Sequence, residues 1–350
     1  MSDISRGQHL ILFPFSPSST ARSFIFPFLC LSVSRTFILL ILSSIMLASF
    51  VLSFLPLTLA APLFGLGSSE ATGAPTPMSL STVNTTLLRP ALFARAAYCS
   101  SASLSSWSCG APCDSLAGVT FLQDGGNQGT IPLYFIAHDA EDQSLVVAHE
   151  GTDPDNILSL LNDAEFALVD VNTTAIPQAA GKGIKVHDGF QSTFERTADG
   201  LLAGVQAQLQ ATGVKKVVVT GHSLGSYFAA GLRNNTGAAL ATMTGAMIKG
   251  AVDPSVDVVV TTFGLPRGGN EAWANFLDSN IGVTFMTNQN DPVPTVPPLL
   301  FGYTHSSGEV HIVDSSQTNI VSCPGHDNEH CVTGNSILHA SITNHLGPYF

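Results

Sequence analysis

Residues 215–225, KKVVVTGHSLG, decide how this chain folds. The β-branched run at 215–220 predicts a buried strand. Gly221–Gly225 is a G-x-S-x-G sequence with Ser223 at its centre, and an Ala-rich stretch that can form a helix follows it. A serine on a sharp turn between a strand and a helix holds its hydroxyl over the strand ends, where it can attack a substrate. Because G-x-S-x-G also occurs by chance, a base and an acid must be found elsewhere.

Two features of this turn serve the same chemistry. Gly221 and Gly225 leave room where the strand and the helix meet. The backbone N–H of Leu224 is free at the helix start and can stabilise a carbonyl oxygen that becomes negative. We expect a second such N–H from Thr152, which follows the strand predicted at 144–150, although an ordinary strand-ending turn is the alternative there.

Composition and strand spacing define the class of fold. The chain has 350 residues, of which 45% are hydrophobic and 11% charged, enough for one large α/β domain. Strands predicted at 215–220, 256–263, 281–287 and 309–313 alternate with helices, so the sheet should be mainly parallel there. Two earlier strands, at 131–138 and 144–150, are expected to pair antiparallel. A helix is predicted over 189–213, ended by Gly213.

The charge of the chain limits the kinds of partner that it can bind. The net charge is −12 and no basic patch stands out, which argues against nucleic acid and against anionic membrane surfaces. No sequence feature points to an obligate protein partner.

The N-terminal region predicts secretion. Residues 37–60 carry no charge and are long enough to span a bilayer, but Pro56 and small residues at 60–61 are typical of a signal-peptide cleavage region. We expect a leader at 1–63 with the signal peptide at 46–61 and an upstream extension before Met46. An uncleaved anchor at 37–60 is the alternative.

Further signs support the secretory route. Three Asn-x-Thr sequons occur, at Asn84, Asn172 and Asn234. Residues 64–86 are rich in Gly, Ser, Pro and Thr and are interpreted as a linker or propeptide remnant, with the catalytic domain at 87–350.

Five cysteines lie after the leader. In a secreted protein, Cys109–Cys113 and Cys323–Cys331 are natural short-range disulfides, and we expect the partner of Cys99 beyond Phe350. The two thiolates and two imidazoles of Cys323, His326, His330 and Cys331 are of the kind that ligates zinc. The oxidising compartment and the adjacent ligands at 330 and 331 argue against it, so no metal and no other cofactor is expected.

The acid should leave the carboxyl end of a strand after the serine, since this fold supplies its groups in the order Ser, Asp, His. Asp291 fits, because it follows a predicted strand and Pro292 and Pro294 stiffen its loop. Asp257 lies at the start of its strand, which is the wrong end for a catalytic acid. Asp314, which follows the late strand, is the second candidate.

Two histidines can serve as the base. His345 follows the last strand on a loop that can fold back, and His339 lies six residues earlier. A serine hydroxyl is a weak nucleophile near neutral pH, so an imidazole must take its proton and a buried carboxylate must orient that ring.

The segment DPDNILSLLNDAEF, at residues 153–166, carries an apolar cluster between acidic flanks. It is either a core helix or a lid whose apolar side opens onto lipid. Its position between the two expected oxyanion donors favours the lid.

Eight ordered blocks at about residues 88–350 carry a family resemblance: AAYCSSASLSSWSCGAPC, LVVAHEGTDPDN, VHDGF, VVVTGHSLG, TTFGLPRGGN, NQNDPVPTVPP, HSSGEVHI and NHLGPYF. The chain resembles the fungal class 3 lipases, a family of filamentous-fungal triacylglycerol lipases and feruloyl esterases. The resemblance implies an α/β-hydrolase fold, with a mostly parallel central sheet and helices on both faces.

The resemblance also assigns roles. It implies Ser223 as nucleophile, Asp291 as acid and His345 as base, and it makes His187 and His222 structural. Thr152 and Leu224 would supply the oxyanion N–H groups. The lid would begin after Thr152 and include Asp153, Ile157, Leu158, Leu160 and Leu161.

Three departures from the family pattern bear on function. Glu150 stands where the family usually has an arginine, which is expected to alter lid pairing. The family tail continues past the final Tyr-Phe and usually ends in a cysteine that would pair with Cys99. Residues 226–237, SYFAAGLRNNTG, separate GHSLG from the Ala238–Ala241 stretch, and we interpret them as an insertion, such as a retained intron.

We therefore expect a secreted serine hydrolase that cleaves carboxylic esters through an acyl-enzyme, with acylglycerols at a lipid–water interface as its substrates. The apolar 157–161 segment favours lipid over soluble aromatic esters. A feruloyl esterase and a phospholipase A1 are the alternatives within the family. Because of the insertion and the tail, a catalytically inactive, lipid-binding homologue is a further alternative.

Overall fold

A computed structural model describes residues 73–128, 131–151, 166–223 and 237–349 of the chain. Within these residues a nine-stranded sheet has the order β1-β11-β10-β9-β8-β7-β4-β3-β2. The strands are β1 (Thr76–Pro77), β2 (Val119–Gly125), β3 (Tyr134–Asp139), β4 (Ser144–His149), β7 (Lys216–His222), β8 (Asp257–Phe263), β9 (Val283–Asn288), β10 (Glu309–Ile312) and β11 (Ile320–Cys323). Two further strands, β5 (Leu168–Asp170) and β6 (Lys185–His187), form a separate antiparallel pair.

The directions of the strands confirm the prediction of a mainly parallel sheet. Neighbouring strands are parallel from β4 through β7, β8 and β9 to β10. The two early strands, β3 and β4, pair antiparallel as expected, and β2 extends this pair. The carboxyl ends of the parallel strands therefore meet at one edge, which is where this class of fold places its functional loops.

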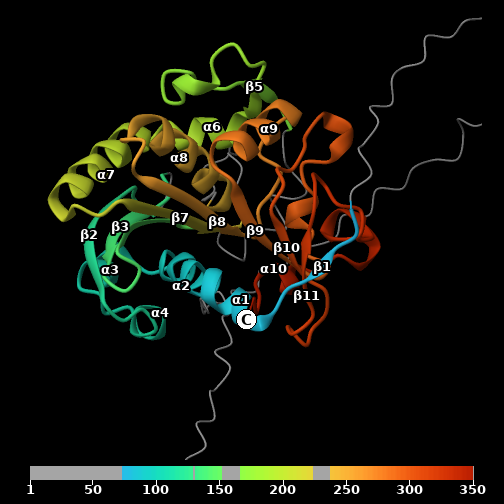
Figure 1. Ribbon diagram of the computed structural model, residues 1–350, viewed down its shortest axis with the longest axis horizontal. Helices are drawn as coiled ribbons and strands as arrows, with labels where there is room; N and C mark the ends of the chain where they lie inside the picture. The colour runs from blue at the N-terminus through green and yellow to red at the C-terminus, as the bar shows by residue number, and fades with distance from the viewer. Residues whose placement is uncertain (1–72, 129–130, 152–165, 224–236, 350) are drawn as a thin grey trace, which may run out of the picture. The chain divides into compact units, whose positions relative to one another are not determined.

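Helices cover both faces of the sheet (Figure 1). On one face lie α1 (Leu80–Thr86), α2 (Leu88–Ala96), α3 (Ser101–Ser105) and α4 (Ala111–Asp114). On the other lie α6 (Asp188–Phe194), α7 (Ala198–Thr212), α8 (Gly237–Ala251) and α9 (Glu271–Asn280). The arrangement is that of an α/β-hydrolase, as the sequence predicts.

The central strands explain the two cores. Along β7, Val217 and Val219 pack in the core beneath α6–α9, and Val218 packs in the core beneath α1 and α2. Successive side chains of a strand point to opposite faces, so a run of valines buries both. The β-branched run before Ser223 is for this reason a central strand.

Two predicted boundaries differ from the structure. The helix expected over 189–213 is two helices, since α6 ends at Phe194 and α7 begins at Ala198, although Gly213 ends α7 with φ +73° as predicted. Residues 76–86, assigned to a linker, form β1 and α1. The backbone of β1 pairs with β11 and Val83 of α1 is fully buried, so the fold begins before residue 87.

Both predicted disulfides are present, Cys109–Cys113 and Cys323–Cys331. Cys99 is free and half-buried, and burial raises the pKa of its thiol. Among the described residues, no helix is long and apolar enough to cross a membrane. The expected leader and the 37–60 segment lie outside the described residues.

Candidate active site

Ser223 lies directly after β7, on a strained turn. Its φ is +74°, a left-handed conformation that costs a residue with a side chain about 1–3 kcal/mol. The backbone N–H of Ser223 donates to the Phe263 carbonyl at 2.9 Å, which ties the turn to the end of β8. A Cβ on Gly221 would lie 2.2 Å from the Gly237 carbonyl oxygen, so only glycine fits at that position.

The helix expected after the serine is α8, and it begins at Gly237. The N–H of Ala238 donates to the Ser223 carbonyl at 3.0 Å. A Cβ on Gly237 would lie 2.6 Å from the His222 carbonyl oxygen. Gly237 thus occupies the close approach predicted for Gly225. Gly225 and Leu224, the expected oxyanion donor, lie outside the described residues.

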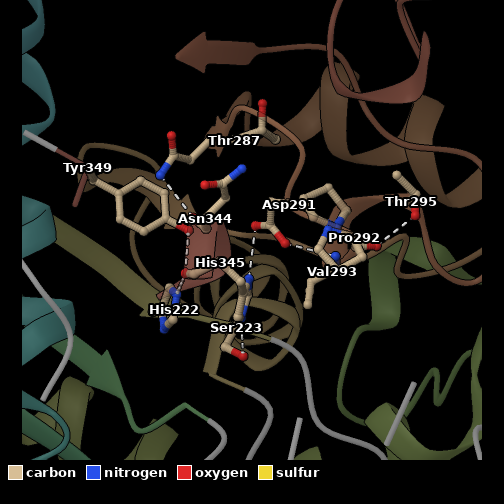
Figure 2. Close-up of polar contacts among 12 residues, drawn as sticks. His222, Ser223, Thr287, Asp291, Pro292, Val293, Thr295, Asn344, His345 and Tyr349 are labelled. Carbon is tan, nitrogen blue, oxygen red and sulfur yellow. Dashed lines mark hydrogen bonds and ion pairs between the residues drawn. The ribbon is translucent and has the colours of Figure 1, made fainter. Parts of the chain in front are cut away.

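Ser223, His345 and Asp291 form one continuous chain of hydrogen bonds (Figure 2). Ser223 Oγ lies 2.6 Å from His345 Nε2, and His345 Nδ1 lies 2.9 Å from Asp291 Oδ2. A carboxylate can only accept, so Nδ1 carries the proton and Nε2 of the neutral ring accepts from the serine hydroxyl. All three residues are buried, at 0–1% exposure. The serine is therefore paired with a base in the geometry that nucleophilic attack requires.

Asp291 is held by the loop that leaves β9. Its N–H donates to the Asn288 carbonyl at 3.0 Å, and its Oδ1 accepts from the Val293 N–H at 2.8 Å. The second carboxylate oxygen is left for His345 (Figure 2). The prolines at 292 and 294 flank Val293 in the 3₁₀ turn Val293–Thr295, as expected of a stiff loop.

His345 ends the short helix α10 (Ile342–His345). Asn288 Nδ2 donates to the carbonyls of Asn344 and Pro348 at 2.9 and 3.1 Å, and the Tyr349 hydroxyl donates to the His345 carbonyl at 3.1 Å. The loop that carries the base is thus fastened to the end of β9, the strand that also delivers the acid.

His222 supports the base by contacting the backbone carbonyl and the ring of His345. Its ring stacks on the His345 ring, with centroids 4.6 Å apart, and its Nε2 donates to the His345 carbonyl at 2.8 Å. Burial and the neighbouring His345 lower the pKa of His222 well below its usual value, so the ring is neutral. Nδ1 must then accept, and the Tyr98 hydroxyl donates to it at 2.6 Å. The structural role predicted for His222 is the positioning of His345.

Tyr98 and Gly264 are functional positions that sequence reasoning missed. Both lie in blocks that carry the family resemblance, but nothing in their spacing predicts a role. A Cβ on Gly264, whose φ is +58°, would lie 2.6 Å from His345 Cε1 and 2.9 Å from Nδ1. A Cβ on Gly151 would lie 2.1 Å from the Tyr98 hydroxyl oxygen. Both glycines leave space that the catalytic assembly fills.

The other candidates do not join the site. Asp314 accepts hydrogen bonds from Ser316 and Asn319, Asp257 is exposed at the start of β8, and His339 is exposed. His187 caps α6 by accepting from the Phe190 N–H at 3.3 Å, which is a structural role.

The four residues considered as zinc ligands have other partners, and His330 Nε2 lies 3.9 Å from a Glu329 carboxylate oxygen. Cys323 and Cys331 are joined in a disulfide, and His326 lies 2.6 Å from an Asp278 carboxylate oxygen, which raises the pKa of His326. Glu309 lies close to the two sulfurs but accepts from the Thr287 hydroxyl at 2.7 Å and the Val332 N–H at 3.1 Å. Burial raises the pKa of this carboxyl to about 7.

The oxyanion and lid predictions fall largely outside the described residues. Thr152 and the residues of the proposed lid, Asp153, Ile157, Leu158, Leu160 and Leu161, are among those not described. Glu150, the residue that departs from the family pattern, is described. It is buried, and its Oε2 accepts from the Leu133 N–H at 3.0 Å.

A strained serine after the central strand, together with a histidine and a buried aspartate from later loops, places this chain in the α/β-hydrolase class that carries a Ser-His-Asp triad. The model of the class 3 lipase family matches residues 146–232 and 235–301. A secreted mono- and diacylglycerol lipase, LIP2 of Malassezia restricta, is 32% identical over 238 residues, which are 67% of this chain and 70% of that protein. The chain belongs to the class 3 lipase family.

Two further relatives are named as lipases of the same kind. The secreted mono- and diacylglycerol lipase MDL5 of Malassezia globosa is 35% identical over 208 residues, and MDL3 of the same organism is 35% identical over 215. The matches span 62% and 66% of the length of these two relatives, and 59% and 61% of this chain. Among solved structures, a lipase from Rhizopus microsporus var. chinensis superposes with a TM-score of 0.67 at 26% identity, covering 80% of this chain and 91% of that one.

Proposed function

We propose that this protein is a secreted serine hydrolase that cleaves carboxylic esters through an acyl-enzyme, with acylglycerols as its substrates. The observation that carries the proposal is the hydrogen-bonded chain from Ser223 through His345 to Asp291. Relatives named as secreted mono- and diacylglycerol lipases support the choice of acylglycerols.

The geometry supports the following mechanism. His345 Nε2 takes the Ser223 proton while Oγ attacks the ester carbonyl carbon, and the resulting imidazolium is stabilised by the Asp291 carboxylate. The same Nε2–H then protonates the leaving alcohol, and an acyl-serine remains. In the second half, His345 takes a proton from water, hydroxide attacks the acyl carbon, and the protonated ring returns the proton to Ser223 as the fatty acid leaves. No step requires a metal or an organic cofactor.

The N–H groups of Thr152 and Leu224 are our proposal for the oxyanion hole, at about 3–4 kcal/mol of barrier each. The position of Gly151 supports the choice of Thr152, because Gly151 lies beside the His222 carbonyl and so beside the catalytic turn. We likewise propose the segment Asp153–Leu161 as the lid. Its support is the apolar cluster in its sequence and the burial of Ser223, which a substrate reaches only if a covering part of the chain moves.

Two alternatives stay within the family, a feruloyl esterase and a phospholipase A1. A third is an inactive lipid-binding homologue. The pairing of Ser223 with a buried His345 and Asp291 favours activity over the inactive alternative, since an unused buried polar chain of this kind stabilises little. Export should remove the leader near residue 61, which mass spectrometry of the mature N-terminus tests directly; a retained 37–60 segment would support the anchor instead.

The decisive assay offers the secreted protein three esters: a triolein emulsion, a short soluble ester and methyl ferulate. We expect turnover of the emulsion and labelling by a serine-directed phosphonate. The Ser223→Ala variant should lose about 10⁵–10⁶-fold in kcat and all labelling. Turnover of soluble esters without the emulsion would reject the lipase proposal, and absence of both turnover and labelling would reject the hydrolase.

A further inference from the structure

Large apolar side chains that are exposed gather along the loops that carry the acid and the base. The described residues expose six of them, and four are Leu299, Leu300, Phe301 and Leu338. Leu300 is 81% and Leu338 is 89% exposed. Leu300 follows Asp291 by nine residues and Leu338 precedes His345 by seven. A single exposed leucine needs no explanation, but a cluster in sequence beside a catalytic loop does.

The first group is held in a fixed turn. Leu299–Phe301 is a 3₁₀ helix in which the N–H of Phe301 donates to the Pro298 carbonyl at 3.0 Å. Gly302 ends it with φ +81° and donates to the Leu299 carbonyl at 2.9 Å. The ring centroids of Phe301 and Phe166 lie 5.3 Å apart. Leu300 is therefore presented on a structured turn, so its exposure does not come from a loose chain end.

Arg267 fastens this turn to the acid loop. Its guanidinium is 2% exposed and donates to the Thr295 carbonyl at 2.5 Å and the Pro297 carbonyl at 3.1 Å. The backbone N–H of Arg267 donates to the Val296 carbonyl at 2.9 Å. The chain from Asp291 to Pro298 is thus anchored immediately before the exposed leucines.

Leu338 projects from a segment anchored to the other end of the same loop. Asn335 Nδ2 donates to the Gln289 carbonyl at 2.6 Å, and the Ser341 N–H donates to the Asn290 carbonyl at 3.0 Å. Leu338 lies between these two attachments in the chain. Leu299–Phe301 and Leu338 therefore flank the acid loop, and we call these four residues the acid-loop patch.

The charges near the acid-loop patch indicate which kind of partner it can bind. Residues 292–304 contain no Asp, Glu, Lys or Arg, and neither do residues 332–341. His305, at the end of the first stretch, is buried, and burial lowers its pKa to about 4, so it is neutral at pH 7. The whole chain carries a net charge of −12, which repels anionic surfaces. Apart from the exposed His339 next to Leu338, these stretches carry no side chain that ionises near neutral pH, and such an apolar surface beside an active site fits the interface of a neutral or zwitterionic lipid.

We propose that the acid-loop patch is a fixed lipid-contacting surface that holds the active site against neutral or zwitterionic lipid, independently of any lid movement. This rests on the proposed function in its choice of lipid as the partner. Leu300 and Leu338 insert among the acyl chains, and the hydrogen-bonded loops that carry them keep Asp291 and His345 at the interface. Because the turn is already ordered, little conformational entropy is lost on insertion.

The test measures binding apart from catalysis. The secreted protein carrying Ser223→Ala is mixed with phosphatidylcholine vesicles, and partitioning is measured by flotation. Adding Leu300→Ser or Leu338→Ser should weaken partitioning about tenfold each, the scale expected for removing one inserted leucine. Leu80→Ser is the matched control, since Leu80 is 40% exposed on α1, on the helix layer across the sheet from α6–α9, and this change should have no effect.

In the Ser223 parent, the same two substitutions should lower triolein hydrolysis but leave kcat/KM on a short soluble ester within twofold. Unchanged partitioning, or a loss equal to that of Leu80→Ser, overturns the proposal. So does a concentration-dependent dimer that Leu300→Ser abolishes without any lipid binding, because the partner would then be a second copy of the chain. A parent that turns over no ester rejects the proposed function, while the vesicle measurement still decides the patch.

Discussion

Replacing Gly264 by alanine should disable the base without unfolding the protein. A Cβ there would lie 2.6 Å from His345 Cε1, and 3.4 Å is the lower limit of ordinary contact, so the ring must move by roughly 0.8 Å. A misplacement of about 1 Å in a catalytic group costs on the order of 10²-fold in rate. We therefore expect kcat on a soluble ester to fall about 100-fold with KM little changed.

Gly282→Ala is the matched control for this experiment. Gly282 has φ +69°, close to the +58° of Gly264, and an added Cβ would meet nothing within 4 Å. Both variants should lose about 1–2 kcal/mol of unfolding stability from the left-handed backbone, which denaturant titration measures. Only Gly264→Ala should lose activity and react slowly with a phosphonate. Equal kcat in the two variants would refute the inference that this glycine makes room for the base.

Three further changes test a residue that supports the triad, a buried carboxyl elsewhere in the fold and the proposed insertion. Tyr98→Phe removes the donor to His222 Nδ1 and should cost about 1–3 kcal/mol of unfolding stability and severalfold in kcat, with KM unchanged; unaltered stability would contradict the pairing. Glu309 has a pKa raised from 4.5 to about 7, so ionising it destabilises the fold as pH rises between those values, by about 3 kcal/mol. In Glu309→Gln, the free energy of unfolding measured by urea titration should differ less between pH 5 and pH 8 than in the parent. An equal difference in both proteins would assign the pH dependence to another group. Deleting 226–237 should retain or raise esterase activity, because Gly225 would then directly precede Ala238 and take the place that Gly237 holds beside the serine; an active parent with an inactive deletion would contradict the insertion hypothesis.

The central part of the fold could be predicted because its sequence signals are local. A run of valines before Ser223 specifies a strand buried on both faces, and Gly213 specifies where α7 ends. The start of the domain could not be placed in this way. The two residues of β1 gain their structure from pairing with β11, some 240 residues later, and no local pattern announces such a partner.

The same distinction applies to the site. Ser223 and Asp291 each follow a predicted strand, so spacing along the chain points to them. His345 needed the family resemblance, because its helix is four residues long and its position is fixed by Asn288 and Tyr349 rather than by its own sequence. Tyr98 acts through His222, across 124 residues of sequence, and a contact of that kind leaves no trace in composition or periodicity.

The turn at Ser223 shows what the nucleophile motif specifies physically. The pattern G-x-S-x-G names Gly225, but the close contact that a second glycine must permit is made by Gly237, against the His222 carbonyl. The Ser223 carbonyl likewise accepts from Ala238, at the start of α8. What the turn requires is a residue without a side chain where the helix begins beside the strand, and its number in the chain is secondary. An insertion between serine and helix is therefore compatible with an assembled triad so long as the helix returns on a glycine.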